Sequence, residues 1–219
     1  FRSRRVGVLN QLLGDFVDSP PVVVKGLVDL GYTAFDASYA DYVAQKKART
    51  DSGIVLGGNA GMVHVFRGND GQEVFGYLPQ EGLSKLSTIA AKDYGTTSNF
   101  HRFFVNGPMN ETDVKIDDAW ANLVLGAMGS GGKTFFALRF PTDFGATLDA
   151  ADLGKDALLW EKSGKDDGDI GYMFADFAVG KIKGGGWKAF IGNGVYSDSG
   201  NSVLLVAGNG HVQHGLGVP

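Results

Sequence analysis

The chain has 219 residues, a formal net charge of −4 and no cysteine. The lack of cysteine excludes disulfide bonds and thiolate metal sites, and the acidic balance provides no basic surface for nucleic acid. No apolar run approaches the roughly 18 residues of a membrane-spanning helix. Glycine is frequent, with 34 residues against 6 prolines, which indicates many tight turns and many short strands.

The chain begins at Phe1 with neither an initiator methionine nor a signal peptide, so we expect a piece of a longer protein. Residues 19–79 predict the first group of strands. The segment SPPVVVKG predicts one strand, and GIVLGGNAGMVHVFRGNDGQEVFGYLP contains three short apolar runs separated by Gly-Asn and Asp-Gly turn signals. This pattern is typical of a tight antiparallel meander.

An insertion at residues 81–101 follows the first group of strands. Leu83, Leu86 and Ile89 have helical spacing, which predicts one short amphipathic helix ending near Lys92 and then a loop.

Residues 102–161 predict a second group of four strands, and residues 171–210 predict a third whose last strand is poorly marked. A turn-rich excursion at residues 141–156 interrupts the second group and has room for one helical turn. The central hairpins place Gly57, Gly126 and Gly192 at corresponding positions, where we expect turns with positive φ.

Four antiparallel strands repeated radially form the blades of a β-propeller, an arrangement that avoids exposed sheet edges. We therefore expect residues 1–219 to form an all-β, partial β-propeller domain. It would contain about three four-stranded antiparallel blades of a larger ring and a short helical insertion. The rest of its own propeller or another copy would complete the ring, with Val22–Val24 and Val203–Val206 near the contact.

An acidic turn at Asp166, Asp167 and Asp169 is the best candidate for a metal site, because hard cations prefer several carboxylate oxygens. The turn lacks alternating spacing and a closing glutamate, so a solvated turn is the competing interpretation.

The four histidines are His64, His101, His211 and His214. We expect His64 and His101 to form structural hydrogen bonds. The other two lie in a glycine-rich tail and are either weak chelators or part of a flexible segment.

The segment GSGGKT at residues 129–134 resembles a phosphate-binding loop but is too short and lies between two apolar β runs. We therefore expect a hairpin turn, since no helix N-terminus is available there. Trp120, Trp160 and Trp187 occupy comparable places in successive groups of strands. We expect them to pack between blades.

Several segments resemble, in the same order, the C-terminal propeller of the PilY/PilC-type adhesins at the tip of bacterial type IV pili. They are LGDFVDSPPVVV, VLGGNAGMVHVFRGNDGQEVFGYLP, HRFFVNGP, WANLVLGAMGSGGKTFFAL and WKAFIGNGVYSDSGNSVLLV. The family's calcium loop, a run of alternating aspartates, has no counterpart here. The resemblance thus leaves calcium to the full-length protein, and no cofactor is expected in this chain.

The resemblance implies a non-enzymatic protein that is exported through the periplasm to the pilus tip or the bacterial outer surface. Its implied roles are pilus assembly, retraction control and attachment. The implied partners are pilin and minor pilin subunits and a host-cell or surface receptor. We expect the insertion at 81–101 and the excursion at 141–156 to make these contacts.

An alternative is a quinoprotein-type, PQQ-dependent propeller oxidoreductase, which shares the turn-and-strand pattern and the Gly-x-Glu strand start at residues 71–73. Such an enzyme needs aromatic and charged groups around a quinone, together with calcium. The sequence offers no such cluster. We assign no catalytic, cofactor-binding or metal-binding residue.

Overall fold

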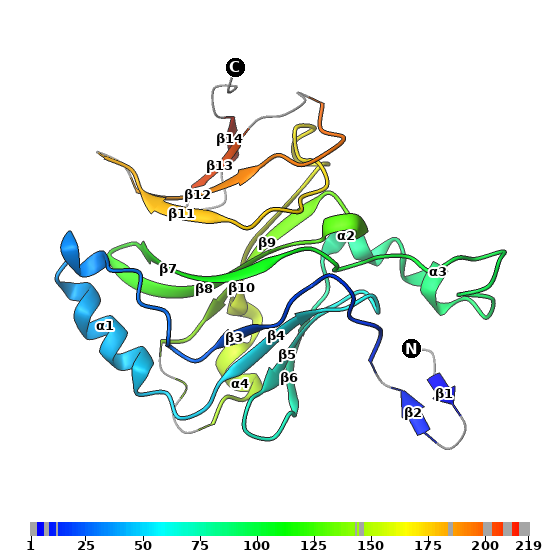
Figure 1. Ribbon diagram of the computed structural model, residues 1–219, viewed down its shortest axis with the longest axis horizontal. Helices are drawn as coiled ribbons and strands as arrows, with labels where there is room; N and C mark the ends of the chain where they lie inside the picture. Colours follow the sequence, from blue (N-terminus) through cyan, green and yellow to red (C-terminus); the bar gives the residue numbers. More distant parts are fainter. Residues whose placement is uncertain are drawn as a thin grey trace.

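The computed structural model describes residues 13–142, 144, 147–183 and 186–198 in full, and the backbone of four further strands at 4–6, 9–11, 203–207 and 212–214. Its main feature is a set of three four-stranded antiparallel sheets, which confirms the predicted all-β propeller architecture. We call them the first, middle and third sheets (Figure 1).

Each sheet is a meander in which sequence neighbours pair. The first sheet contains β3 (Val22–Val24), β4 (Gly53–Gly57), β5 (Val63–Arg67) and β6 (Glu73–Tyr77). The middle sheet contains β7 (Met109–Ile116), β8 (Ala119–Ala127), β9 (Thr134–Phe140) and β10 (Leu158–Ser163). The third sheet contains β11 (Ala178–Lys181), β12 (Trp187–Gly192), β13 (Val203–Ala207) and β14 (Val212–His214). A separate hairpin joins β1 (Arg4–Val6) to β2 (Leu9–Gln11).

The poorly marked last strand of the third group forms after all, since β14 pairs with β13 through Val206 and Val212. Its short length explains the weak sequence signal, because three residues are too few to display alternation.

The helical content differs from the prediction. The longest helix is α1 (Ser38–Lys47), which lies between β3 and β4 and was not expected. The predicted helix in the 81–101 insertion is two short helices, α2 (Gln80–Leu83) and α3 (Leu86–Ala90). The excursion contains the expected helical turn, α4 (Ala150–Leu153). Three 3-10 turns complete the described elements: η1 (Tyr32–Ala34), η2 (Gly129–Gly131) and η3 (Lys155–Ala157).

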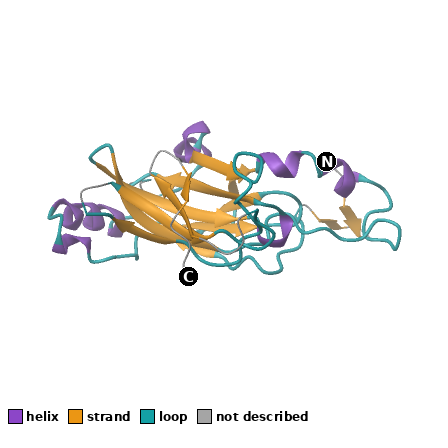
Figure 2. Cartoon of the chain, turned by 90° about the horizontal axis from the view of Figure 1, so that it is seen from above, coloured by secondary structure: helices purple, strands orange, loops and turns teal. Residues whose placement is uncertain are grey.

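The middle sheet packs on both of its faces. Successive residues of a strand point to opposite faces, and on β8 Val124 enters the core shared with the first sheet, whereas Leu123 and Leu125 enter the core shared with the third. Figure 1 shows the middle sheet between the other two, and Figure 2 shows the strands gathered centrally with helices toward both ends.

The tryptophans lie where the sequence predicted, between blades. Trp187 of the third sheet is 6% exposed, and its ring centroid lies 5.6 Å from that of Trp120 on the middle sheet in an edge-on arrangement. Trp160 packs into the same core, with its ring 5.6 Å from Phe135.

The turn assignment of Gly126 and Gly192 was wrong. Both glycines lie within strands, β8 and β12, and neither has a left-handed φ. Gly126 is needed for space, because an added Cβ would lie 2.6 Å from Phe136 Cζ and 2.7 Å from Met109 Cγ. Gly57, which was likewise expected in a turn, is the last residue of β4, and a Cβ added there would lie close to Val105 and Ser19.

The contact with another polypeptide that is predicted at Val22–Val24 stays a prediction, and the three side chains differ in exposure. Val24 is fully buried in the core with the middle sheet, Val22 packs against that core, and Val23 is 50% exposed. The side chains of Val203–Val206 lie outside the described residues.

Candidate functional site

The first insertion, residues 81–101, borders an open hollow of about 520 Å³. It is lined by Lys85, Thr88, His101, Arg102, Phe103, Ser130, Gly131 and Tyr172. These residues come from α3 and its flanks, from the segment before β7, from η2 and from the segment before β11. Long-range folding therefore assembles the hollow. Figure 1 shows α3, which contributes Thr88 to the lining, at the end of the molecule opposite α1.

Lys85 ties the helical insertion to the η2 turn. Its Nζ lies 3.1 Å from Glu81 Oε1 and donates a 2.5 Å hydrogen bond to the Gly131 carbonyl. Glu81 also accepts a 2.7 Å hydrogen bond from Thr134 Oγ1 at the start of β9. The insertion is thus fixed to the middle sheet by a charged, hydrogen-bonded group.

His101 is fixed from the other side of the hollow. Its Nε2 lies 2.9 Å from Asp15 Oδ2, and the same oxygen accepts a 2.9 Å hydrogen bond from Asn59 Nδ2. Asn59 is 2% exposed and accepts a 2.9 Å hydrogen bond from the Phe104 amide. This chain of contacts locks the segment before β7 against the turn between β4 and β5.

The environment of Asp15 favours its ionised form. Partial burial alone would raise the pKa of this carboxyl, but hydrogen bonds from Asn59 and its own backbone, together with His101, hold the pKa below its usual value. The carboxylate therefore stays charged beside the His101 ring at neutral pH.

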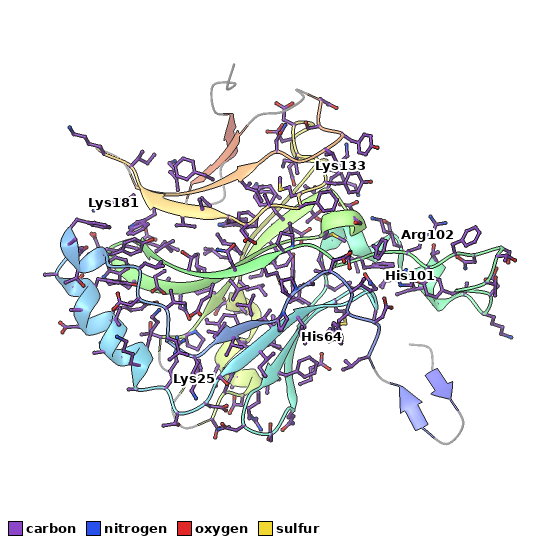
Figure 3. All side chains as sticks on the ribbon, in the orientation of Figure 1. Lys25, His64, His101, Arg102, Lys133 and Lys181 are labelled. Atoms are coloured by element: carbon purple, nitrogen blue, oxygen red, sulfur yellow. The ribbon has the colours of Figure 1, made fainter. Side chains whose placement is uncertain are left out.

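Arg102 is held by its backbone, whereas its side chain is exposed. Its amide donates a 2.9 Å hydrogen bond to the Tyr94 hydroxyl, which lies 3.3 Å from the Arg102 carbonyl. Figure 3 shows His101 and Arg102 together at the base of the loop that carries α3, with Lys133 above them. Lys133 Nζ lies 5.8 Å from the centre of the Tyr172 ring and donates to the Tyr196 carbonyl.

The GSGGKT segment forms the expected hairpin turn and not a phosphate loop. The 3-10 turn η2 leads directly into β9. Gly131 allows the closest approach in the hollow, since an added Cβ there would lie 1.6 Å from the Phe104 carbonyl oxygen. Glycine at this position therefore lets the turn close against the segment that carries Arg102 and Phe103.

The acidic turn caps its own backbone. Asp166 Oδ2 accepts hydrogen bonds from the Ser163 amide and hydroxyl at 2.8 and 3.0 Å, and Asp167 Oδ1 accepts one from the Asp169 amide at 3.0 Å. Within the described part of the chain, no group of three or more His, Cys, Asp or Glu side chains is arranged to hold a metal ion.

The structural hydrogen bonds predicted for His64 and His101 are confirmed. His64 Nδ1 lies 2.7 Å from Glu73 Oε1, and its ring lies beside Phe16 and Phe66. The side chains of His211 and His214 lie outside the described residues.

Described residues of the excursion at 141–156 pack in the core and are not among those that line the hollow. Phe144 and Leu148 are 5% and 0% exposed and belong to the core between the first and middle sheets. The Leu148 amide donates a 2.9 Å hydrogen bond to Asp51 Oδ2, and a capping box at Asp149 begins α4. Of the two expected contact segments, the insertion at 81–101 borders the hollow, through Lys85, Thr88 and His101.

Sequence reasoning found the insertion but missed the partners that complete the hollow. The sequence predicts a hairpin turn at Ser130 and Gly131 and places Tyr172 in the third group of strands, at 171–210. The useful signal was Arg102 and Phe103, a cation and an aromatic residue directly after an insertion.

Comparison with known protein families identifies the family. The model of the PilY1 beta-propeller domain matches residues 13–207 of this chain. The chain belongs to the PilY1 beta-propeller domain family. The quinoprotein alternative finds no support in this match.

The chain is also similar to curated PilY1 proteins over most of its length. The chain is 30% identical over 210 residues to the type IV pilus biogenesis factor PilY1 of Pseudomonas aeruginosa strain PAO1, covering 94% of this chain and 16% of that protein. It is 28% identical over 207 residues to a type IV pilus biogenesis factor PilY1 homolog of Xylella fastidiosa strain Temecula1, covering 92% and 16%. The chain thus spans about a sixth of the length of these PilY1 relatives.

A solved structure agrees with the fold. The crystal structure of the Pseudomonas aeruginosa PilY1 C-terminal domain matches with a TM-score of 0.65 and 26% sequence identity, covering 90% of this chain and 37% of the solved chain. Among the described residues, none of the helices has the length and apolar character needed to cross a membrane.

Proposed function

We propose that this chain is the propeller part of a type IV pilus biogenesis factor that works by binding and not by catalysis. The nearly end-to-end match to the PilY1 beta-propeller domain family supports this proposal, as do the names of the relatives. Pilus assembly is the central role in the proposal, with control of retraction and attachment to surfaces or host cells as further roles. The protein would act outside the cell, at the pilus tip or on the bacterial outer surface.

The hollow beside the first insertion is the observation that carries the mechanism. Its lining residues are fixed to two sheets by Lys85, His101 and their hydrogen-bonded partners. Binding residues on loops that a rigid scaffold positions are typical of recognition sites. We propose that pilin or minor pilin subunits, or an external receptor, contact this rim.

Other sequence completes the propeller in this proposal, either the rest of a longer protein or another copy of the chain. The chain itself carries no cofactor in the proposal, and any calcium site belongs to another part of the longer protein. The proposal gives the chain no enzymatic activity.

Pilus counts in a piliated bacterium test the function. Deleting the gene that encodes the longer protein should strongly reduce surface pili, and restoring the gene should recover them. The variant Ser130→Trp fills the hollow and should lower pilus number at normal protein level, whereas Ser87→Trp on the exposed face of α3 should not. Repeating the counts in a retraction-deficient strain separates assembly from retraction. Normal pilus numbers in the deletion strain would contradict the proposal.

A further inference from the structure

The basic side chains of the hollow are not all paired with a carboxylate. Lys85 lies beside Glu81 at 3.1 Å, and His101 lies beside Asp15 at 2.9 Å. Arg102 differs, because its recorded hydrogen bonds within the described residues involve only its backbone. Among the described residues that line the hollow, none carries a carboxylate. An exposed guanidinium at the edge of a hollow is therefore available for an anionic ligand.

The chemistry of Arg102 favours a carboxylate. A guanidinium is charged at every physiological pH and presents a planar set of donors that matches the two oxygens of a carboxylate. Thr88, Ser130 and Tyr172 line the same hollow, and hydroxyl side chains of this kind can donate further hydrogen bonds. These groups together suit a ligand that bears carboxylates and carbonyl groups.

Apolar side chains at the rim distinguish a peptide from a simple anion. Phe103 lines the hollow and is 39% exposed. Phe100, which lies two residues before Arg102, is 66% exposed. Exposed aromatic side chains beside a cation contact apolar side chains well and are common at the anchoring points of protein interfaces. A polypeptide can place an apolar side chain next to an acidic one.

The hollow is also fixed before a ligand arrives. Tyr94 holds the backbone of Arg102, and the contacts from His101 through Asp15 to Asn59 hold the neighbouring residue. Ligand binding to a fixed site loses little conformational entropy on the protein side. A volume near 520 Å³ lies within the usual range of ligand sites, roughly 300–1,000 Å³.

We propose that this hollow binds an acidic segment of a protein partner, with a carboxylate on Arg102 and an apolar side chain against Phe103. The identification of the partner as a protein rests on the proposed role in pilus assembly, whereas the preference for an acidic, partly apolar ligand rests on the hollow itself. The binding experiment uses purified 219-residue chain and therefore judges the ligand chemistry independently of pilus counts.

Fluorescence polarisation with a labelled, amidated peptide, Gly-Phe-Asp-Asp-Phe-Gly, tests the proposal. Saturable binding is expected at low ionic strength, with a dissociation constant between about 1 μM and 1 mM. The neutral peptide with asparagine in place of aspartate should bind about tenfold more weakly or worse. Salt at about 0.5 M should weaken binding of the acidic peptide, since exposed charges are screened.

Matched variants place the site on the molecule. Arg102→Gln should weaken binding of the acidic peptide by about tenfold or more. Arg102→Lys keeps the charge but loses the planar set of donors, so its affinity should lie between that of Arg102→Gln and that of the native chain. Lys25→Gln removes an exposed cation far from the hollow and should leave affinity unchanged (Figure 3). Thermal melting of each variant verifies its fold.

The proposal is overturned by unsaturable binding, by equal affinity for the two peptides, or by an equal effect of Lys25→Gln and Arg102→Gln. Tighter binding of tri-galacturonate than of the peptide would also overturn it and would assign the hollow to acidic sugars. If the chain binds the acidic peptide as expected but deletion of the gene for the longer protein leaves pilus number unchanged, only the proposed function is contradicted.

Discussion

Lys46 of α1 and Asp113 of β7 form a fully buried ion pair, with Nζ 2.6 Å from Oδ2 and both side chains 0% exposed. Tyr39, Tyr42 and Asn122 also donate hydrogen bonds to the Asp113 carboxylate, at 2.7, 3.2 and 3.1 Å. The same burial, with the nearby Asp113 charge, raises the pKa of both tyrosines, so they remain neutral donors. This network fastens α1 to the middle sheet.

Replacing Lys46 with methionine should lower the free energy of unfolding by about 3–5 kcal/mol, because it leaves a buried carboxylate without its cation. Urea denaturation measures the change. The matched control is Lys47→Met, since Lys47 is 54% exposed and lies 3.6 Å from Asp29. A surface pair of this kind contributes about 0–1 kcal/mol. Equal effects of the two substitutions would contradict the importance of the buried pair.

Replacement by alanine should destabilise the chain at Gly126 but have little effect on stability at Gly192. Gly126→Ala should destabilise the chain by about 1–3 kcal/mol, because its Cβ would overlap Phe136 and Met109. Gly192→Ala should be within about 0.5 kcal/mol of the native chain, since no described atom lies within 4 Å of the added Cβ. Thermal melting compares them, and a larger loss at Gly192 would contradict the packing explanation.

Asp36 should add an acid-sensitive contribution to stability. A hydrogen bond from Lys115 at 2.8 Å and one from the Ser38 hydroxyl at 2.6 Å lower the pKa of Asp36 from 3.8 to about 2. Because the folded pKa lies below the unfolded value, this contribution is fully present above pH 3.8 and is lost as the pH falls toward 2.

Urea titrations at about pH 5 and about pH 2.5 test this effect. The Asp36→Asn variant should lose less stability over the interval than the native chain does. Asp41→Asn, which alters an exposed aspartate on α1, serves as the control and should follow the native pH dependence. An unchanged acid sensitivity in Asp36→Asn would remove the proposed contribution.

Removing the Trp187 side chain from the interface of the middle and third sheets should be costly. Its ring contacts Tyr32 at 4.6 Å and Trp120 at 5.6 Å, and Trp187→Ala should cost about 3–5 kcal/mol. Phe174→Ala, at a side chain 56% exposed, should change stability by less than about 0.5 kcal/mol. Urea denaturation monitored by near-ultraviolet circular dichroism provides the measurement, and similar costs would refute the assignment.

Most of the strands and their hairpins could be predicted from the amino-acid sequence alone. Alternating apolar residues and Gly-Asn or Asp-Gly turns act over a few residues, so their signals survive without knowledge of the fold. The meander from β4 to β6 and the hairpin at 129–134 were predicted for this reason. The ordered motifs also led to the family that the comparisons then identified.

The positions of buried charges and the contacts between distant loops could not be predicted from the sequence, because they depend on the three-dimensional packing. The inward stripe of α1 is Tyr39, Tyr42, Val43 and Lys46, and a lysine in that stripe makes physical sense only beside Asp113, 67 residues away. The hollow likewise joins Arg102 to Ser130 and Tyr172. Such contacts depend on how sheets stack, because long-range packing supplies the partners that local sequence cannot specify.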